Sequence, residues 1–137
     1  MARFLLNTNI CIYIAKRRPL EVMARFERLQ AGEAALSVIT YGELRLGAEK
    51  SASRPVALER LERLIEWVPV LSLPPDAVIG YGLIRAALER QGRPIGANDL
   101  WIAAHALAAK LTLVSNNTRE FERIAGLTLE NWVANPL

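Results

Sequence analysis

The fold is decided by the stretch Phe4-Leu5-Leu6-Asn7-Thr8-Asn9-Ile10-Cys11-Ile12-Tyr13. An apolar run typical of a buried strand ends on three small polar residues, and a second apolar run with helical spacing follows. Open α/β folds bind their ligands at the carboxyl ends of parallel strands. The stretch therefore predicts that Asn7, Thr8 and Asn9 lie at the functional edge of a sheet.

Outward from this stretch, strand-like apolar segments alternate with helical segments along the chain. Such alternation predicts the α/β class, with a mainly parallel central sheet of about four or five strands flanked by helices. We expect strands at 2–6, 34–37, 69–71, 111–114 and, at the edge, 128–130. We expect helices at 9–15, 20–30, 40–50, around 61–68, from 76 to about 90, at 99–110 and from 118 onward.

The composition fits one domain over residues 1–137. Hydrophobic residues make up 52% and charged residues 23%, which favours a packed core over disorder. No apolar run approaches the ~20 residues that span a membrane, and the first residues lack a secretory pattern. The single cysteine, Cys11, is expected in the core of a cytoplasmic protein. His105, between two alanines, is expected to be a core or interface residue rather than a ligand.

A net charge of +3 permits binding of nucleic acid without requiring it. Several arginines lie on predicted helices near glutamates, and for these we expect exposed i,i+4 ion pairs. These residues are Arg25, Arg28, Arg60 and Arg63, with Glu21, Glu59 and Glu62. The better candidates for contacts with phosphate lie in or near the predicted site loops, and they are Arg17, Arg18, Arg93 and Arg119.

Four polar residues each follow an apolar strand or open a helix: Asn7, Glu43, Asp99 and Asn117. In a parallel sheet such positions converge on one edge although they are far apart in the sequence. Carboxylates and amides without a cysteine or histidine pair suit a hard cation such as Mg²⁺ or Mn²⁺. Such an ion activates water and stabilises a leaving oxygen, so the pattern indicates phosphodiester hydrolysis.

Each of these residues also has a purely structural interpretation. Thr40-Tyr41-Gly42-Glu43 fits a capping box, and Asn98 or Asp99 fits a helix N-cap. Asn116-Asn117 fits a turn, and Asn7-Thr8-Asn9 fits a cap between a strand and a helix. The residues alone therefore leave a metal site and a set of coincident caps as open alternatives.

Five segments in order resemble a known family over nearly the whole chain. The segments are Leu6-Asn7-Thr8-Asn9-Ile10-Cys11-Ile12-Tyr13, Ile39-Thr40-Tyr41-Gly42-Glu43-Leu44, Gly47-Ala48-Glu49-Lys50-Ser51, Gly92-Arg93-Pro94-Ile95-Gly96-Ala97-Asn98-Asp99 and Val114-Ser115-Asn116-Asn117-Thr118-Arg119-Glu120-Phe121. The series ends in Leu129-Glu130-Asn131-Trp132. On these segments the chain is similar to PIN-domain ribonucleases of the VapC toxin type, which implies a single PIN domain over residues 1–137.

The resemblance implies roles for particular residues. Glu43 and Asp99 match metal-binding carboxylates of the family, Asn7 stands where its first aspartate belongs, and Asn117 matches the fourth catalytic position. The implied activity is an endoribonuclease that depends on Mg²⁺ or Mn²⁺ and cleaves structured RNA, with the anticodon loop of initiator tRNA as the expected target. Residues that hold these groups, or water bound to the metal, are expected at Thr8, Asn9, Ser115 and Glu120.

Asn7 departs from the family pattern. An amide has the shape of a carboxylate but no negative charge, and its nitrogen donates rather than accepts. We interpret Asn7 as an inactivating substitution, made because the active chain would poison its expression host. Two alternatives remain: a binding module without catalysis, in which Asn7 is native, and a metal-dependent DNase on the same fold.

The resemblance also implies partners. A VapB-type antitoxin is expected to lay its tail in a groove and block the site. The substrate is expected to be RNA, above all tRNA. A homodimer is expected to join two sites in one basic surface, with a larger assembly when the antitoxin is bound. The expected setting is the cytoplasm, without contact to a membrane.

Overall fold

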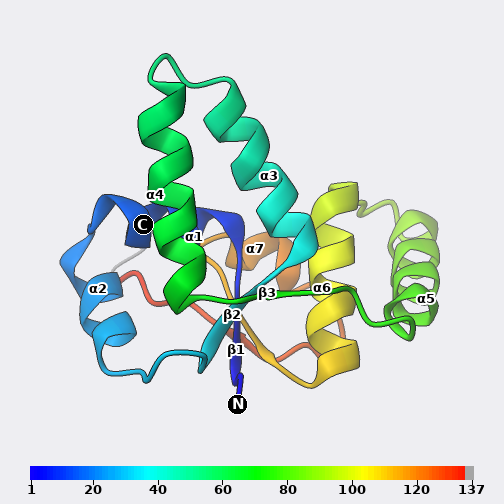
Figure 1. Ribbon diagram of the computed structural model, residues 1–137. Coiled ribbons are helices and arrows are strands. Elements are labelled where there is room, and N and C mark those ends of the chain that lie inside the picture. Colours follow the sequence, from blue (N-terminus) through cyan, green and yellow to red (C-terminus); the bar gives the residue numbers. More distant parts are fainter. Residues whose placement is uncertain (135–137) are drawn as a thin grey trace.

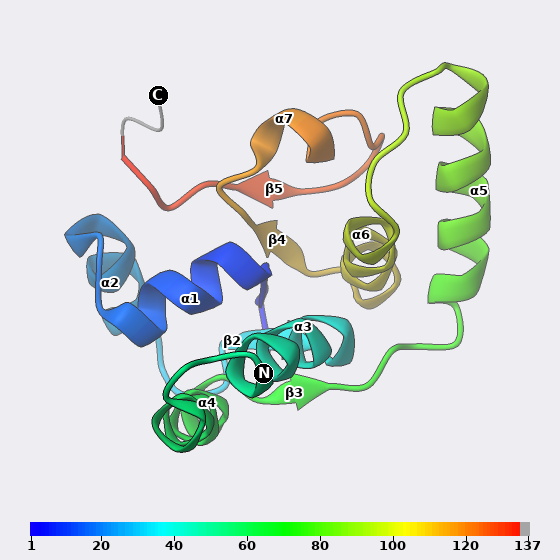
Figure 2. The same ribbon diagram turned by 90° about the horizontal axis from the view of Figure 1, so that it is seen from above.

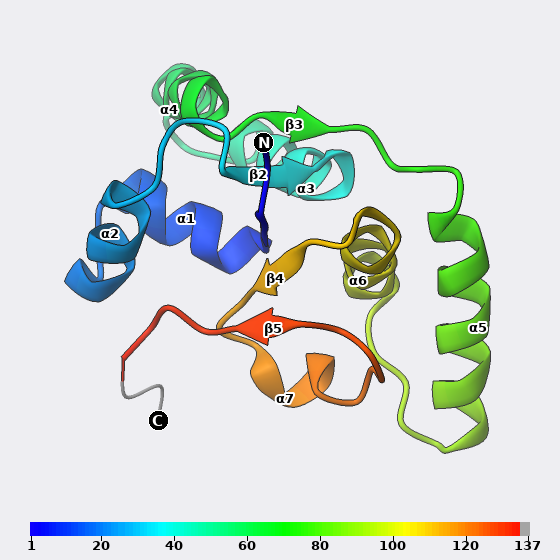
Figure 3. The same ribbon diagram turned by 90° about the horizontal axis from the view of Figure 1, so that it is seen from below.

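A computed structural model describes residues 1–134 and has a five-stranded parallel sheet at its centre. The strands lie in the order β3-β2-β1-β4-β5, which Figure 3 shows from below. Their bounds are β1 (Phe4–Leu6), β2 (Ala34–Ser37), β3 (Val70–Leu71), β4 (Thr112–Val114) and β5 (Leu129–Glu130). Phe4 pairs with Ala34 on one side and Thr112 on the other, so β1 is the central strand. The parallel strands all end at one edge, where β1 leads directly into Asn7.

Helices connect the strands and cover both faces of the sheet (Figures 1 and 2). Their bounds are α1 (Thr8–Lys16), α2 (Leu20–Glu27), α3 (Val38–Glu49), α4 (Arg54–Trp67), α5 (Ala77–Arg90), α6 (Ala97–Ala109) and α7 (Thr118–Phe121). Seen from above, α1, α3, α6 and α7 surround the end of β1 (Figure 2). Three connections from a strand to a helix, β1–α1, β2–α3 and β4–α7, therefore meet at the same edge of the sheet as the start of α6.

The side chains of β1 alternate between two hydrophobic clusters. Phe4 and Leu6 pack with residues of α1, α2 and α4, whereas Leu5 packs with residues of α5, α6 and α7. Because side chains of a strand point to opposite faces in turn, a strand buried on both faces is apolar throughout, as Phe4-Leu5-Leu6 is. Asn7 is the first residue after this run, and it remains buried with the strand, 4% exposed.

The predicted elements are confirmed with shifts at their ends. The strand expected at 2–6 covers 4–6, and the helix expected at 20–30 ends at Glu27. The third helix begins at Val38 rather than at Thr40, because Ser37 is its N-cap and accepts a hydrogen bond from the Ile39 N–H. Cys11 and His105 are both buried, as expected. Burial raises the pKa of the Cys11 thiol to about 12.

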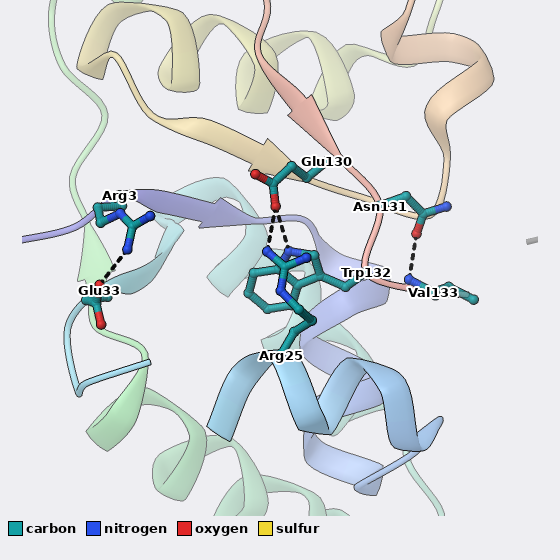
Figure 4. A network of polar contacts seen from close by, with 7 residues as sticks. All are labelled: Arg3, Arg25, Glu33, Glu130, Asn131, Trp132 and Val133. Atoms are coloured by element: carbon teal, nitrogen blue, oxygen red, sulfur yellow. Dashed lines mark hydrogen bonds and ion pairs between the residues drawn. The ribbon is translucent and has the colours of Figure 1, made fainter. Parts of the chain in front are cut away.

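The predicted i,i+4 ion pairs are only partly confirmed, since within residues 1–134 neither Arg28 nor Arg60 forms an ion pair with a glutamate. Arg63 does pair with Glu59 four residues earlier, but Arg25 does not pair with Glu21. Its Nη2 donates to Glu130 Oε1 at 2.9 Å, and Trp132 Nε1 donates to the same oxygen at 3.0 Å (Figure 4). Arg25 on α2 lies beside the end of β5, so the carboxylate of Glu130, and not that of Glu21, accepts its hydrogen bond. Through Glu130, these two hydrogen bonds connect Trp132, in the segment after β5, to Arg25 on α2.

No helix within residues 1–134 has both the length and the apolar character needed to cross a membrane.

Candidate functional site

Asn7 lies at the bottom of the site, between β1 and α1. Its backbone N–H donates to the Val114 carbonyl at 2.8 Å, which continues the pairing of β1 with β4. Its side-chain Nδ2 donates to Ser115 Oγ at 3.0 Å, and its Oδ1 is buried without a partner. Asn7 occupies the N-cap position of α1, yet its side chain makes no capping hydrogen bond. A buried acceptor without a donor costs free energy, so this oxygen marks a position suited to a ligand.

Glu43 projects from α3 and is held by two neighbours. Thr8 Oγ1 donates to Glu43 Oε1 at 2.5 Å, and Asn98 Nδ2 lies 3.4 Å from Glu43 Oε2. The capping-box interpretation of Thr40 and Glu43 is wrong, because Ser37 is the N-cap and Glu43 is the sixth residue of the helix. The orientation of Glu43 therefore comes from α1 and α6 and not from the start of its own helix.

Asp99 lies in the first turn of α6 and faces two other carboxylates. The N-cap of α6 is Gly96, and no side chain caps this helix, so neither Asn98 nor Asp99 acts as the cap. The pKa of Asp99 is raised from 3.8 to about 6, first by burial and then by the negative charges of Glu43 and Glu120. Acids from α3, α6 and α7 thus share one small region, which carries a concentrated negative potential.

Ser115 and Asn117 complete this edge of the sheet. Ser115 is fully buried after β4, and its Oγ accepts from both Asn7 Nδ2 and the Asn117 N–H, the latter at 2.9 Å. Asn117 occupies the N-cap position of α7 without a capping hydrogen bond from its side chain. Asn9 Oδ1 accepts from the Asn116 N–H at 3.3 Å. The two segments that the sequence placed at strand ends are therefore joined by side chains beneath the site.

Sequence reasoning missed two amides. Asn98 contacts Glu43, as described, and its only signal was its position next to Asp99. Asn116, which was interpreted as a turn residue, donates to the Tyr13 hydroxyl and accepts from Asn131 Nδ2, both at 3.2 Å. It links α1 to the segment after β5, and nothing in the local sequence pattern indicates a link over that separation.

The four arginines proposed for phosphate contacts do not gather in one place. Arg17 and Arg18 lie past the far end of α1, about 13 Å along the helix from its first residue. They line a groove of about 1040 Å³ between α1, α2 and α4 instead. Arg93 and Arg119 are exposed, the first in the loop before α6 and the second on α7. These two belong to the segments that carry Asp99 and Asn117.

The donor set fits a hard divalent cation, although with one charge fewer than three acids would supply. The polar atoms that converge are carboxylate and amide oxygens, the ligands that Mg²⁺ and Mn²⁺ prefer. The unpartnered Oδ1 of Asn7 and the negative charge around Asp99 both favour a cation here. Within residues 1–134, however, no three acids, histidines or cysteines are placed to hold a metal ion. Of the three positions expected to hold the metal, Glu43 and Asp99 are carboxylates and Asn7 is a neutral amide; Glu120 adds negative charge nearby.

Comparison with known proteins places this geometry in a family. Residues 4–127 match the family model described as PIN domain. "Ribonuclease VapC2" of Haemophilus influenzae is 46% identical over 133 residues, which is 97% of this chain and 100% of the relative. "tRNA(fMet)-specific endonuclease VapC" of Shigella flexneri is 45% identical over 96% of this chain and 99% of the relative.

Solved structures agree with the sequence comparison. The structure of DNA-bound VapBC from Salmonella typhimurium superposes with a TM-score of 0.90 at 41% identity, over 97% of this chain and all of that chain. VapBC-1 from nontypeable Haemophilus influenzae gives a TM-score of 0.86 at 40% identity, over 94% of this chain and 97% of that chain. The chain with the Asn7, Glu43 and Asp99 site belongs to the PIN-domain family, among the VapC ribonucleases.

Proposed function

We propose that this chain is the toxin of a VapBC-type toxin–antitoxin system, with a metal-dependent endoribonuclease site that the Asn7 amide disables. The observation that carries the proposal is the convergence of Glu43, Asp99 and the unpartnered Asn7 oxygen at the carboxyl edge of the sheet. The raised pKa of Asp99 supports it, because acids with strongly shifted pKa values gather at functional sites.

Glu43, Asp99 and the residue at position 7 are the groups that would hold Mg²⁺ or Mn²⁺. When bound, such an ion supplies an activated water and neutralises charge on the phosphate and the leaving oxygen. The chain itself supplies orientation. Thr8 and Asn98 fix the two oxygens of Glu43, and Ser115 fixes the side chain at position 7. Above pH 6 Asp99 is ionised and can accept a hydrogen bond or a cation.

Asn7 weakens this site through its chemistry, not its shape. An amide oxygen is a neutral ligand, and the amide nitrogen directed at Ser115 cannot accept a proton. Restoring the acid adds one negative charge at the edge of the sheet where Glu43 and Asp99 lie, which favours binding of a cation. We therefore propose that Asn7→Asp converts a weakly binding, weakly active chain into an active nuclease.

The names of the relatives favour tRNA as substrate and VapB as partner. The Shigella relative is named for tRNA(fMet), and several of the similar structures are VapBC complexes. We propose a cytoplasmic protein that cleaves a tRNA anticodon loop, forms a homodimer and is blocked by a VapB-type antitoxin. Arg93 and Arg119 are the proposed phosphate contacts, since single-stranded loops expose their backbone to such groups.

The test compares the chain with its Asn7→Asp variant on total tRNA and on single-stranded and flapped DNA. Each is assayed with Mg²⁺, with Mn²⁺ and with a chelator, and Asn7→Asp with Asp99→Asn serves as the matched control. Discrete tRNA cleavage by Asn7→Asp alone, abolished by the chelator, supports the proposal. Preferential cleavage of DNA would favour the DNase. Tight tRNA binding without cleavage by the folded Asn7→Asp variant would favour a binding module.

A further inference from the structure

Two hydrogen bonds between side chains are fully buried among residues 1–134. One joins Asn7 to Ser115 and belongs to the site described above. The other joins His105 Nδ1 to Ser37 Oγ at 2.9 Å, and these side chains are 1% and 0% exposed. The proposed function uses neither His105 nor Ser37. A buried polar pair in an alanine-rich helix interface requires an explanation, because an apolar pair would fill the same space without a desolvation cost.

The bond connects the two helices that carry the carboxylates. Ser37 is the N-cap of α3, six residues before Glu43, and His105 lies on α6, six residues after Asp99. Figure 1 shows that α3 leads away from the sheet while α6 runs back toward it, so the two helices are antiparallel. With a rise of 1.5 Å per residue, the bond lies about 9 Å from the carboxylate position along each helix.

A second contact joins the same helices at the level of the carboxylates. Asn98 Nδ2 reaches Glu43 Oε2, and the charge of Glu43 raises the pKa of Asp99. The two helices are therefore linked at two levels, a buried one at Ser37 and His105 and an exposed one at Glu43 and Asn98. The buried link is short and shielded from water, whereas the exposed one is 3.4 Å long. The buried link is the stronger constraint on how far α3 slides along α6.

The donors and acceptors at Ser37 are satisfied in one arrangement. Ser37 Oγ accepts from the Ile39 N–H at 3.1 Å, and its own proton is free to be donated to His105 Nδ1. In that arrangement the imidazole is neutral and carries its hydrogen on Nε2. Burial lowers the pKa of His105, which favours that neutral form. Ser37 thereby both caps α3 and ties the first turn of α3 to α6.

We propose that His105 is a positioning residue: through Ser37 it fixes α3 against α6 and so sets the separation of the Glu43 and Asp99 carboxylates. The inference rests on the proposed function, because the separation matters only if both carboxylates hold one cation. Groups that orient metal ligands typically contribute about 10–100-fold to metal affinity or activity. An effect of that size is expected here although His105 does not contact the site.

The test uses His105→Leu, which keeps an apolar volume, and His105→Asn, whose amide can restore a bond at the place of Nδ1. Ser37→Ala removes the same bond from the other helix, and Ile102→Val on α6 is the packing control, since Ile102 is fully buried. All four are made in the Asn7→Asp chain. The readouts are the Mn²⁺ dissociation constant, kcat and KM for tRNA, and a metal-free distance between spin labels at the exposed positions Arg45 and Ala109.

We expect His105→Leu and Ser37→Ala to weaken Mn²⁺ binding by about tenfold or more. We expect kcat to fall similarly with KM within about twofold, and the label distance to shift or broaden. Because Ser37→Ala also removes the cap of α3, the double variant His105→Leu with Ser37→Ala should be no worse than Ser37→Ala alone. His105→Asn should recover most of the loss, and Ile102→Val should change none of the three readouts. Unchanged label distances and Mn²⁺ affinity in folded His105→Leu would overturn the proposal.

The metal-free distance separates this proposal from the proposed function. If the Asn7→Asp chain neither binds Mn²⁺ nor cleaves tRNA, the nuclease function fails. In that case an altered label distance in His105→Leu still supports the structural link, and an unaltered one refutes it.

Discussion

Replacing Asp99 with asparagine should stabilise the metal-free chain at neutral pH. Asp99 is half-buried near Glu43 and Glu120, and its pKa lies near 6 in the folded state against an ordinary value of 3.8. Between these values the folded chain binds more protons than the unfolded chain, so ionisation of Asp99 disfavours folding as the pH rises. The penalty is absent below about pH 4 and complete above about pH 6.

The size of this effect follows from the same pKa. One pKa unit corresponds to about 1.4 kcal/mol, and solvent screening of a half-buried carboxylate reduces the total to the order of 1 kcal/mol. For a chain of this length, Asp99→Asn should raise Tm by about 3–5 °C at pH 7.5 and leave it unchanged near pH 4.

The assay is thermal unfolding of both chains from pH 4 to pH 8 in the presence of a chelator. The difference between the two curves reports Asp99 and its repulsion of Glu43 and Glu120. Glu33, whose pKa is lowered first by the Gln30 N–H, and Glu49, whose pKa is lowered by Arg54 and Arg45, contribute equally to both chains. A variant that is less stable than the parent at pH 7.5, or a difference that does not vary with pH, would refute the reasoning from crowded negative charge.

Three other substitutions or treatments test the packing around the site. Ser115→Ala leaves the Asn7 amide and the Asn117 N–H without their shared acceptor, so the free energy of unfolding in urea should fall by about 1–3 kcal/mol; an unchanged value would contradict the buried contact. Cys11 should react with thiol reagents only after unfolding, since burial raises its pKa to about 12, and rapid labelling of the folded chain at pH 8 would be inconsistent with that burial. Glu130→Gln removes the ion pair with Arg25, whose partners are both 38% exposed, so the free energy of unfolding should fall by less than about 1 kcal/mol and less still in high salt. If the loss of unfolding free energy does not depend on salt, it comes from the contact of Glu130 with Trp132 and not from the ion pair.

The fold could be predicted because its signals are local. The apolar run Phe4-Leu5-Leu6 with its polar end, and the i,i+3 spacing of Leu61 and Leu64, depend only on neighbouring residues. All five of these apolar residues are confirmed in the core. The start of α3 was missed because Ser37 ends β2 and caps α3 at once, so the residue belongs to two patterns. Arg25 was paired wrongly because Glu130 is distant in sequence and adjacent in space.

The sequence indicates which polar residues follow strands or open helices, but it does not indicate which of their side chains contact one another. The sequence placed Asn7, Glu43 and Asp99 at strand ends and helix starts, and parallel topology brings such positions together. It could not separate Glu43 from a capping box, since that distinction depends on where the helix begins. Thr8 contacts Glu43, and Ser37 contacts His105. Both contacts join residues far apart in the sequence, so the spacing of residues along the chain cannot predict them.

The most direct test of the account is a Mn²⁺ titration of the chain and its Asn7→Asp variant at pH 7.5, with free Mn²⁺ followed by electron paramagnetic resonance. One further negative charge on a cation ligand in a partly buried site is worth more than the ~1.4 kcal/mol that corresponds to a tenfold change in affinity. We expect Asn7→Asp to bind Mn²⁺ about tenfold more tightly or better, and we expect this gain to be lost when Asp99→Asn is added. Equal affinities for the two chains, or binding that survives the loss of Asp99, would contradict the account.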